Sequence, residues 1–250
     1  MSQSRRMGAV IVGDELLSGK RPDRHLPHLI EVLGRRGLQV AWCRYEGDDG
    51  VRLAEALRQT RVDGIPVLCF GGIGTTPDDR TRQAAAQAFG LPLVRHPEAV
   101  ALIEQQFGEH AYPTRVLMAE LPQGAGLIPN PYNRIPGFSL QHHHFFPGFP
   151  QMAWPMLDWL LEHRYPQSWE PDRECAVRVT GVRESDLCAL MDTLSDRYPQ
   201  VRLFSLPHLG EVPAIELGFR GERAAVRVAY SELLQALDDF GLHYTPLVTD

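Results

Sequence analysis

Residues 65–79, with the sequence IPVLCFGGIGTTPDD, join an apolar run to a glycine-rich loop that ends in two acids. The apolar run 65–70 predicts a buried strand, and the spacing of apolar residues over 78–89 predicts a helix that stops at Gly90. Thr76 would cap that helix, Pro77 would occupy its first position, and Asp79 would complete the cap. This stretch therefore predicts a strand, a loop and a helix in direct succession.

The same order of elements occurs twice upstream. Residues 8–13 and 38–45 are apolar enough for strands, and residues 23–36 and 50–61 have the periodicity of amphipathic helices. Three β-then-α units predict a parallel sheet covered by helices on both faces, a three-layer α/β/α domain. Ligands bind such sheets at the carboxyl ends of the strands, where the loops 13–22 and 71–79 would lie.

The rest of the chain divides at a linker. Residues 113–149 are rich in Pro, Gly and aromatic side chains and predict loops with short strands, followed by a helix over 150–163. The stretch 166–172, PQSWEPD, has the composition of a linker. We therefore expect an α/β domain over residues 1–165 and a smaller α+β domain over 170–250, with the order β-α-β-β-α.

Composition excludes several classes of protein. Residues 1–164 carry 17 basic and 17 acidic side chains, whereas residues 165–250 carry 8 and 14, so the net charge of −6 lies in the second part and argues against a nucleic-acid partner. No apolar run is long enough to cross a membrane, and no signal peptide is recognisable. The four scattered cysteines are typical of reduced thiols, which predicts a cytoplasmic protein.

Capping does not explain why Gly71, Gly72 and Gly74 follow a buried strand. Glycine permits positive φ and close approach of a ligand to the main chain, and a helix start offers free N–H groups to an anion. Asp78 and Asp79 would repel a phosphate unless a divalent cation lay between them, and Mg²⁺ is commonly held by one or two carboxylates together with substrate phosphates. The loop thus predicts a metal-bridged phosphate, with Asp78 and Asp79 as the metal ligands.

The first loop has complementary side chains. Gly13, Asp14 and Glu15 follow a strand directly, and Ser18 and Lys20 come next. Lys20 is the single lysine among 25 basic residues, and a compact ammonium suits a point contact to phosphate. A polar loop without a ligand, with Asp23 capping the next helix, is the alternative interpretation.

Together these motifs resemble the molybdopterin-binding domain of the MoaB/Mog/CinA superfamily. The sequences GDELLSG at 13–19 and GGIGTTPDDRTR at 71–82 carry the resemblance, which covers about residues 7–165. Within the superfamily, the chain is most similar to the N-terminal module of CinA proteins. Residues 170–250 look like the small domain that follows this module. The C-terminal amidase domain of full-length CinA has no counterpart up to Asp250, so no amidase activity is expected.

The resemblance implies a ligand pocket and names its residues. Later loops that complete the pocket in the family correspond to Asn130, Asn133, Pro136-Gly137 and Pro147-Gly148. This chain departs from the family in having Thr75 where many members have Pro and His25 where many have Asn. An imidazole would thus replace a neutral amide near the pocket.

Three functions follow from these expectations. The first is a metal-dependent nucleotide pyrophosphatase, since CinA-type modules are associated with ADP-ribose hydrolysis; Asp78, Asp79 and Glu15 would be its catalytic residues. The second is a non-catalytic protein that holds molybdopterin or a nucleotide for a partner. The third is a degenerate module kept for assembly, with the small domain forming a homo-oligomer contact. The expected ligand-binding residues are Gly13, Asp14, Ser18, Lys20, His25, Gly71, Gly72, Gly74, Thr75, Thr76, Asn130, Asn133, Pro136, Gly137, Pro147 and Gly148.

The run His142-His143-His144 suggests a metal site at first sight. Adjacent residues on a strand face opposite ways, so only His142 and His144 would share a face. Histidines of the core or the pocket lining are the simpler interpretation.

Overall fold

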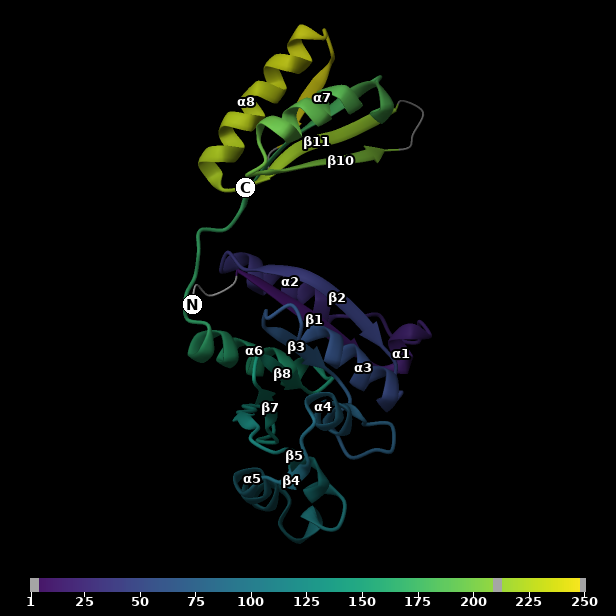
Figure 1. Ribbon diagram of the computed structural model, residues 1–250, viewed down its shortest axis with the longest axis vertical. Helices are drawn as coiled ribbons and strands as arrows, with labels where there is room; N and C mark the ends of the chain where they lie inside the picture. Colours follow the sequence, from purple (N-terminus) through teal and green to yellow (C-terminus); the bar gives the residue numbers. More distant parts are fainter. Residues whose placement is uncertain (1–4, 209–212, 248–250) are drawn as a thin grey trace. The chain divides into compact units, whose positions relative to one another are not determined.

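The computed structural model describes residues 5–208 and 213–247, and the chain divides into two units, residues 1–169 and 170–250 (Figure 1). Each unit has its own hydrophobic core. Across the described residues, no helix combines the length and the apolar character that a membrane span requires.

A six-stranded sheet forms the centre of the first unit. Its strand order is β2-β1-β3-β8-β7-β6, in which β2, β1, β3 and β8 are parallel and β7 and β6 are antiparallel. This mostly parallel sheet confirms the predicted α/β class. The strands are β1 (Arg6–Val12), β2 (Gln39–Glu46), β3 (Val67–Phe70), β6 (Gly126–Ile128), β7 (Gly137–Leu140) and β8 (His143–Phe146).

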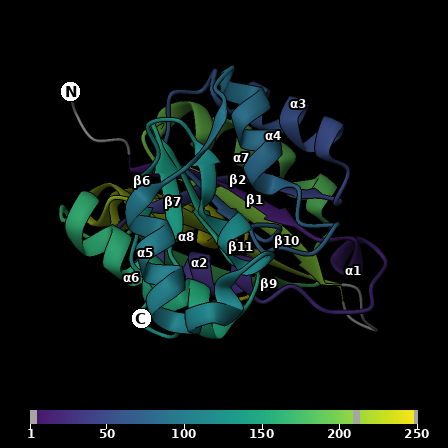
Figure 2. The ribbon, with the colours of Figure 1, turned by 90° about the horizontal axis from the view of Figure 1, so that it is seen from below.

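Alternation along β1 explains the three layers. Val10 and Val12 point to the face covered by α3 (Gly50–Thr60) and α4 (Thr81–Phe89). Ala9 and Ile11 point to the opposite face, covered by α2 (His25–Arg35) and α6 (Pro150–Arg164). A strand buried on both faces carries apolar residues at successive positions, as β1 does. Figure 2 shows α3 and α4 on one side of the sheet and α2 and α6 on the other.

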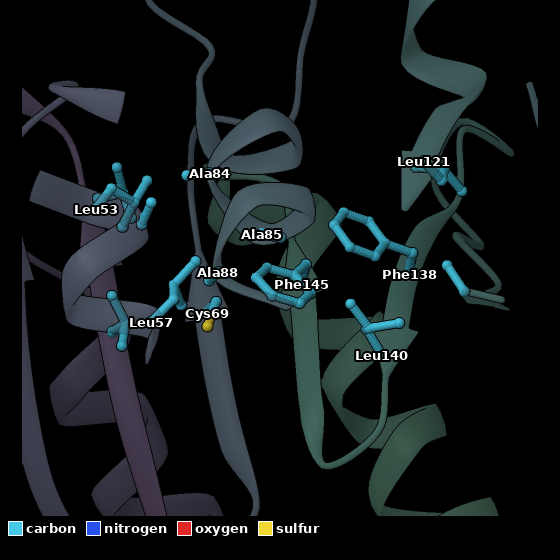
Figure 3. Close-up of a cluster of buried hydrophobic side chains, with 14 of the residues drawn as sticks. Leu53, Leu57, Cys69, Ala84, Ala85, Ala88, Leu121, Phe138, Leu140 and Phe145 are labelled. Carbon is cyan, nitrogen blue, oxygen red and sulfur yellow. The ribbon is translucent and has the colours of Figure 1, made fainter. Parts of the chain in front are cut away.

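The α3–α4 face is closed by aromatic and aliphatic side chains from distant parts of the chain. Figure 3 shows Phe138 of β7 and Phe145 of β8 side by side. Their ring centroids are 4.4 Å apart. Leu53 and Leu57 of α3 and the small alanines of α4 pack in the same cluster. The loop 71–79 follows β3 directly and therefore begins at the carboxyl edge of the sheet.

An excursion of the chain lies between α4 and β6. It contains the two-stranded sheet of β4 (Leu93–Arg95) and β5 (Glu120–Pro122), helix α5 (Pro97–Phe107), and the 3₁₀ turns at 108–111 and 115–119. The chain then enters β6, β7 and β8, where the sequence predicted loops and short strands. The remaining helix of this unit is the short α1 (Asp14–Leu17), directly after β1.

The second unit is an antiparallel four-stranded sheet with two helices. Its strand order is β10-β11-β9-β12, and α7 and α8 pack on one face. The predicted order β-α-β-β-α is present, and β12 adds a fourth strand at the edge, where its Pro246 is tolerated. The elements are β9 (Arg173–Thr180), α7 (Glu184–Arg197), β10 (Arg202–His208), β11 (Ala214–Gly221), α8 (Arg223–Asp239) and β12 (Tyr244–Leu247).

Candidate functional site

A cavity of about 520 Å³ lies at the carboxyl ends of β1 and β3. It is built from the loops that follow these strands, from residues 130–136, and from the β8–α6 connection. The cavity thus brings together segments more than one hundred residues apart in sequence. Of the residues expected from sequence, those that line it are Gly13, Glu15, Gly71, Gly72, Gly74, Thr75, Thr76, Asp78, Asp79, Asn130, Asn133, Pro136, Pro147 and Gly148.

The glycines of the 71–74 loop are required by the protein's own packing. Gly71 and Gly72 have φ of 105° and 67°, which disfavours any residue with a side chain. A Cβ on Gly71 would lie 2.3 Å from the carbonyl oxygen of Val12, and one on Gly72 would lie 2.3 Å from Oγ1 of Thr81. The positive φ expected from the sequence is present, and tight contact with β1 and α4, rather than approach of a ligand, is sufficient to explain the missing side chains.

The helix after this loop begins later than predicted. Thr76, Pro77 and Asp79 form a separate turn, closed by the Asp79 N–H donating to Thr76 O at 3.0 Å. The Asp79 carboxylate oxygen Oδ2 accepts from Thr76 N at 2.8 Å and from Thr76 Oγ1 at 2.5 Å. Because these residues satisfy one another in the turn, α4 starts at Thr81, whose Oγ1 donates to Gly71 O.

The two aspartates of this loop differ in their freedom. Asp78 is exposed at the cavity. One oxygen of Asp79 is committed to the turn, as described above. Asp78 is therefore the more available ligand for a cation.

Asp48 also lines the cavity, although no motif in the sequence marks it as a site residue. It follows β2, accepts a hydrogen bond from Asp14 N at 3.0 Å, and donates its own N–H to Asp14 Oδ1 at 3.2 Å. Burial raises the pKa of the Asp48 carboxyl, and the negative charges of Asp14, Glu15 and Asp78 raise it further. The site therefore contains several carboxylates within range of one another's charge.

Five expected ligand-binding residues do not line this cavity. Asp14 uses its carboxylate to hold the Asp48 loop, and Ser18 and Lys20 are exposed in the segment after α1. Gly137 is buried in β7, where a Cβ would lie 2.3 Å from Phe145 O, so strand packing explains it. His25 lies beside a second, smaller cavity described next.

A cavity of about 280 Å³ adjoins the first and shares Val12, Glu15, Arg21, Gly148 and Phe149 with it. His25 is 5% exposed there. Its Nε2 donates to Gly148 O at 3.0 Å, its ring stacks on Phe70, and burial lowers its pKa. The imidazole therefore ties the start of α2 to the β8–α6 connection.

Asn130 and Asn133 build the turn that forms one wall of the main cavity. Asn130 Nδ2 donates to Asn133 Oδ1 at 2.7 Å and to Ile135 O at 2.9 Å, and its Oδ1 accepts from Tyr132 N. Asn133 Oδ1 also accepts from Ile135 N. These amides shape the wall rather than presenting all their polar atoms to a ligand.

Further lining residues could not be recognised from local motifs. Arg21 follows α1 and is the basic residue among the lining side chains, whereas the apolar ones come from the end of β1, the glycine loop, the excursion, the 130–136 turn, the β8–α6 connection and α6. The apolar lining residues, glycines and prolines aside, are Val12, Ile73, Phe107, Met118, Ile135, Phe149 and Met152.

Two residues of the histidine run belong to the core, whereas His142 is exposed. His143 and His144 are buried in β8, where His143 Nε2 shares a 2.9 Å hydrogen bond with Thr60 Oγ1 and His144 bonds with Ser139 and Tyr165. Burial lowers the pKa of His143 to about 4 and that of His144 to about 3. Within residues 5–208 and 213–247, no three His, Cys, Asp or Glu side chains are grouped so that they could hold a metal ion.

Comparison with known proteins agrees with this architecture. A CinA-like protein of Syntrophotalea carbinolica is 34% identical over 194 residues, covering 72% of this chain and 46% of its own length. A CinA-like protein of Citrifermentans bemidjiense is 29% identical over 249 residues, covering 94% of this chain and 59% of its own length. The chain thus spans about half the length of these curated relatives.

A solved structure has the same fold in the first unit. The crystal structure of the protein CinA with unknown function from Thermoplasma acidophilum superposes with a TM-score of 0.58 at 26% identity, covering 63% of this chain and 97% of that one. Residues 8–167 match the family described as a probable molybdopterin binding domain. This match spans more than half of the sequence and includes every residue that lines the main cavity, so the chain belongs to that family.

Proposed function

We propose that the main cavity binds a phosphorylated ligand of nucleotide or molybdopterin type together with a divalent cation. The observation that carries this proposal is the charge of the lining, in which four carboxylates face a single guanidinium, that of Arg21. A phosphate alone would be repelled, because like charges at close range disfavour binding. A cation between the two groups would remove that repulsion. The four carboxylates are those of Glu15, Asp48, Asp78 and Asp79.

The side chains present fit a cation that arrives with its ligand. The described residues offer no group of three protein ligands for a permanently bound ion. Mg²⁺ commonly takes one or two carboxylates and completes its shell with phosphate oxygens and water. Asp78 and Glu15 would hold the ion, with the free oxygen of Asp79 beside them. When bound, the ion would neutralise a diphosphate and polarise its phosphorus–oxygen bonds.

The remainder of the cavity suits an organic phosphate with a flat ring. Its volume of about 520 Å³ is in the range of small-molecule sites. The apolar end, with Phe107, Met118 and Met152, would contact the ring, while the main chain of the glycine loop lies at the acidic end. Both a nucleotide and a pterin combine these two parts.

We infer hydrolysis of a diphosphate such as ADP-ribose as the reaction. A water molecule would add to one phosphorus, the bridging phosphorus–oxygen bond would break, and AMP and ribose 5-phosphate would leave. A carboxylate would take the proton from water. Asp48 suits this role because it lines the cavity and because burial raises the pKa of its carboxyl, which makes the carboxylate a stronger base.

Incubation with ADP-ribose and Mg²⁺, Mn²⁺ or Co²⁺ tests the reaction, with AMP release measured by chromatography. We expect metal-dependent release that Asp78→Ala reduces by at least about tenfold, because the variant lacks one cation ligand. Equal AMP release by the wild type and the variant would contradict the proposal.

A non-catalytic binding protein is the second candidate, and the family's description supports it. It predicts that a pterin phosphate binds, as measured by fluorescence titration, without any turnover of ADP-ribose. A degenerate module is the third, supported by the finding that the loop's glycines and Asp79 are satisfied by the protein itself. It predicts that neither ligand changes the melting temperature.

A further inference from the structure

Arg82 is a buried arginine that joins two walls of the main cavity. Its side chain comes from the first turn of α4, and the residue is only 3% exposed. We propose that Arg82 is a positioning residue that fixes the glycine loop 71–79 against the excursion wall, residues 115–120, and so sets the shape of the ligand site. This inference rests on the proposed function for the identity of the ligand, but not for the connection itself.

The contacts of the guanidinium place it between the two walls. Its Nη2 donates to Gly74 O at 2.6 Å, on the glycine loop. Its Nη1 donates to Leu117 O and, at 3.3 Å, to Glu120 O, on the excursion wall. Gly74 lines the cavity from one side, and Met118, next to Leu117, lines it from the other. One side chain thus bonds to carbonyls of two segments that are more than forty residues apart in sequence.

Each wall is also held to its own neighbours, the glycine loop by Thr81 N donating to Gly72 O at 2.9 Å and the excursion wall by His96 N donating to Ala119 O at 2.9 Å, but neither of these bonds joins one wall to the other. The loop 71–79 contains no helix or strand, and residues 115–119 form only a 3₁₀ turn. Carbonyl groups in such segments need donors when they are buried, and an unpaired carbonyl is costly. The fork of a guanidinium supplies donors in two directions at a fixed spacing, which a lysine ammonium does not.

The positive charge of Arg82 also interacts with carboxylates at the acidic end of the cavity. Burial lowers the pKa of Arg82, while the carboxylates of Asp79 and Glu120 act in the opposite direction and favour its charged form. Asp79 in turn holds the Thr76 turn, which carries Asp78. Displacing the Arg82 guanidinium would therefore disturb the placement of both aspartates of the loop.

A purely structural role would predict a different response to substitution. Arg82→Lys keeps the positive charge but cannot hold both walls, so it separates charge from geometry. Arg61→Lys is the matched control. Arg61 Nη1 donates to Ala88 O at the other end of α4, and Arg61 does not line the cavity. If Arg82 only stabilised the fold, both variants would lower the melting temperature without a specific effect on the site.

The test combines calorimetric titration of ADP-ribose in the presence of Mg²⁺, thermal unfolding, and hydrogen exchange of the full chain. For Arg82→Lys we expect about tenfold weaker binding, as for a lost hydrogen bond to a buried group, and faster exchange in both 71–80 and 115–120. Exchange in β9, β11 and α8 of the second unit serves as the internal reference. Arg61→Lys should bind like the wild type.

Binding and exchange unchanged in Arg82→Lys would overturn the inference, as would faster exchange in only one of the two segments. If the wild type does not bind ADP-ribose with Mg²⁺, the proposed function fails, and the exchange of the two segments still decides the role of Arg82. If Arg82→Lys does not fold, Arg82→Gln, which retains a single amide donor group, takes its place in the same comparison.

Discussion

Asp14 and Asp48 exchange hydrogen bonds across the loops that follow β1 and β2, each accepting on its carboxylate from the main-chain N–H of the other. The contact leaves little room beside it, since a Cβ on Gly47 would lie 2.5 Å from Asp14 Oδ1. This exchange holds the Asp48 carboxyl at the cavity and places it near other acids. Asp48 is thus part of the site although it is far in sequence from both the 13–22 loop and the 71–79 loop.

Asp48→Asn should therefore separate structure from chemistry. The amide oxygen can still accept from Asp14 N, so we expect the melting temperature to stay within a few degrees of the wild type. Loss of the carboxylate removes the proposed base, so AMP release from ADP-ribose should fall by about 10²-fold or more. Asp49→Asn is the control, because Asp49 caps α3 without lining the cavity. Equal losses in the two variants would refute the role of Asp48.

Gly72→Ala should destabilise the protein through contact as well as through backbone strain. Gly72 and Gly64 have φ of 67° and 64°, but a Cβ on Gly72 meets Thr81 Oγ1 at 2.3 Å whereas one on Gly64 meets nothing within 4 Å. We expect Gly64→Ala to cost about 1 kcal/mol and Gly72→Ala at least about 1 kcal/mol more in the free energy of unfolding by urea. Equal costs would show that the loop yields to the added methyl group.

Acid should destabilise the first unit through its buried histidines. The pKa values of His143 and His144 are lowered to about 4 and about 3, so the unfolded chain binds their protons at a higher pH than the folded chain does. Stability is therefore lost as the pH falls from about 6.5 towards these values, by about 2 kcal/mol for each histidine between pH 7 and pH 5.

Urea unfolding at pH 7 and pH 5 checks this expectation in the wild type and in His144→Gln. The glutamine amide can replace part of the bonding to Ser139 and Tyr165, and it does not titrate. The variant should lose about 2 kcal/mol less than the wild type over the same pH interval. An identical loss in both proteins would mean that His144 does not contribute to the pH dependence.

The sequence was sufficient for the central architecture because the relevant signals are local. The apolar run of β3 and the amphipathic spacing of α2 and α3 each arise within about a dozen residues, and they fix a parallel sheet with helices on both faces. Asp23 also caps the start of α2 as expected, accepting from His25 N and Leu26 N. The position of the two main loops at one sheet edge followed from topology alone.

Features that depend on long-range packing were beyond such reasoning. The start of α4 was misplaced because Thr76 and Asp79 satisfy each other rather than the helix. Nothing local in residues 93–122 indicates that Phe107 and Met118 reach the cavity. Lys20, the single lysine, is predicted from the sequence to contact phosphate, but it is exposed in the segment after α1, and the basic residue of the lining is Arg21.

The most direct test of the account is calorimetric titration of the protein with ADP-ribose, once with Mg²⁺ and once with EDTA. Because four carboxylates and one arginine surround the cavity, we predict binding with Mg²⁺, at least about tenfold weaker binding with EDTA, and loss of most of this difference in Asp78→Asn. Binding of equal strength with and without the cation would contradict the central claim that a divalent ion joins the acidic loops to a phosphate.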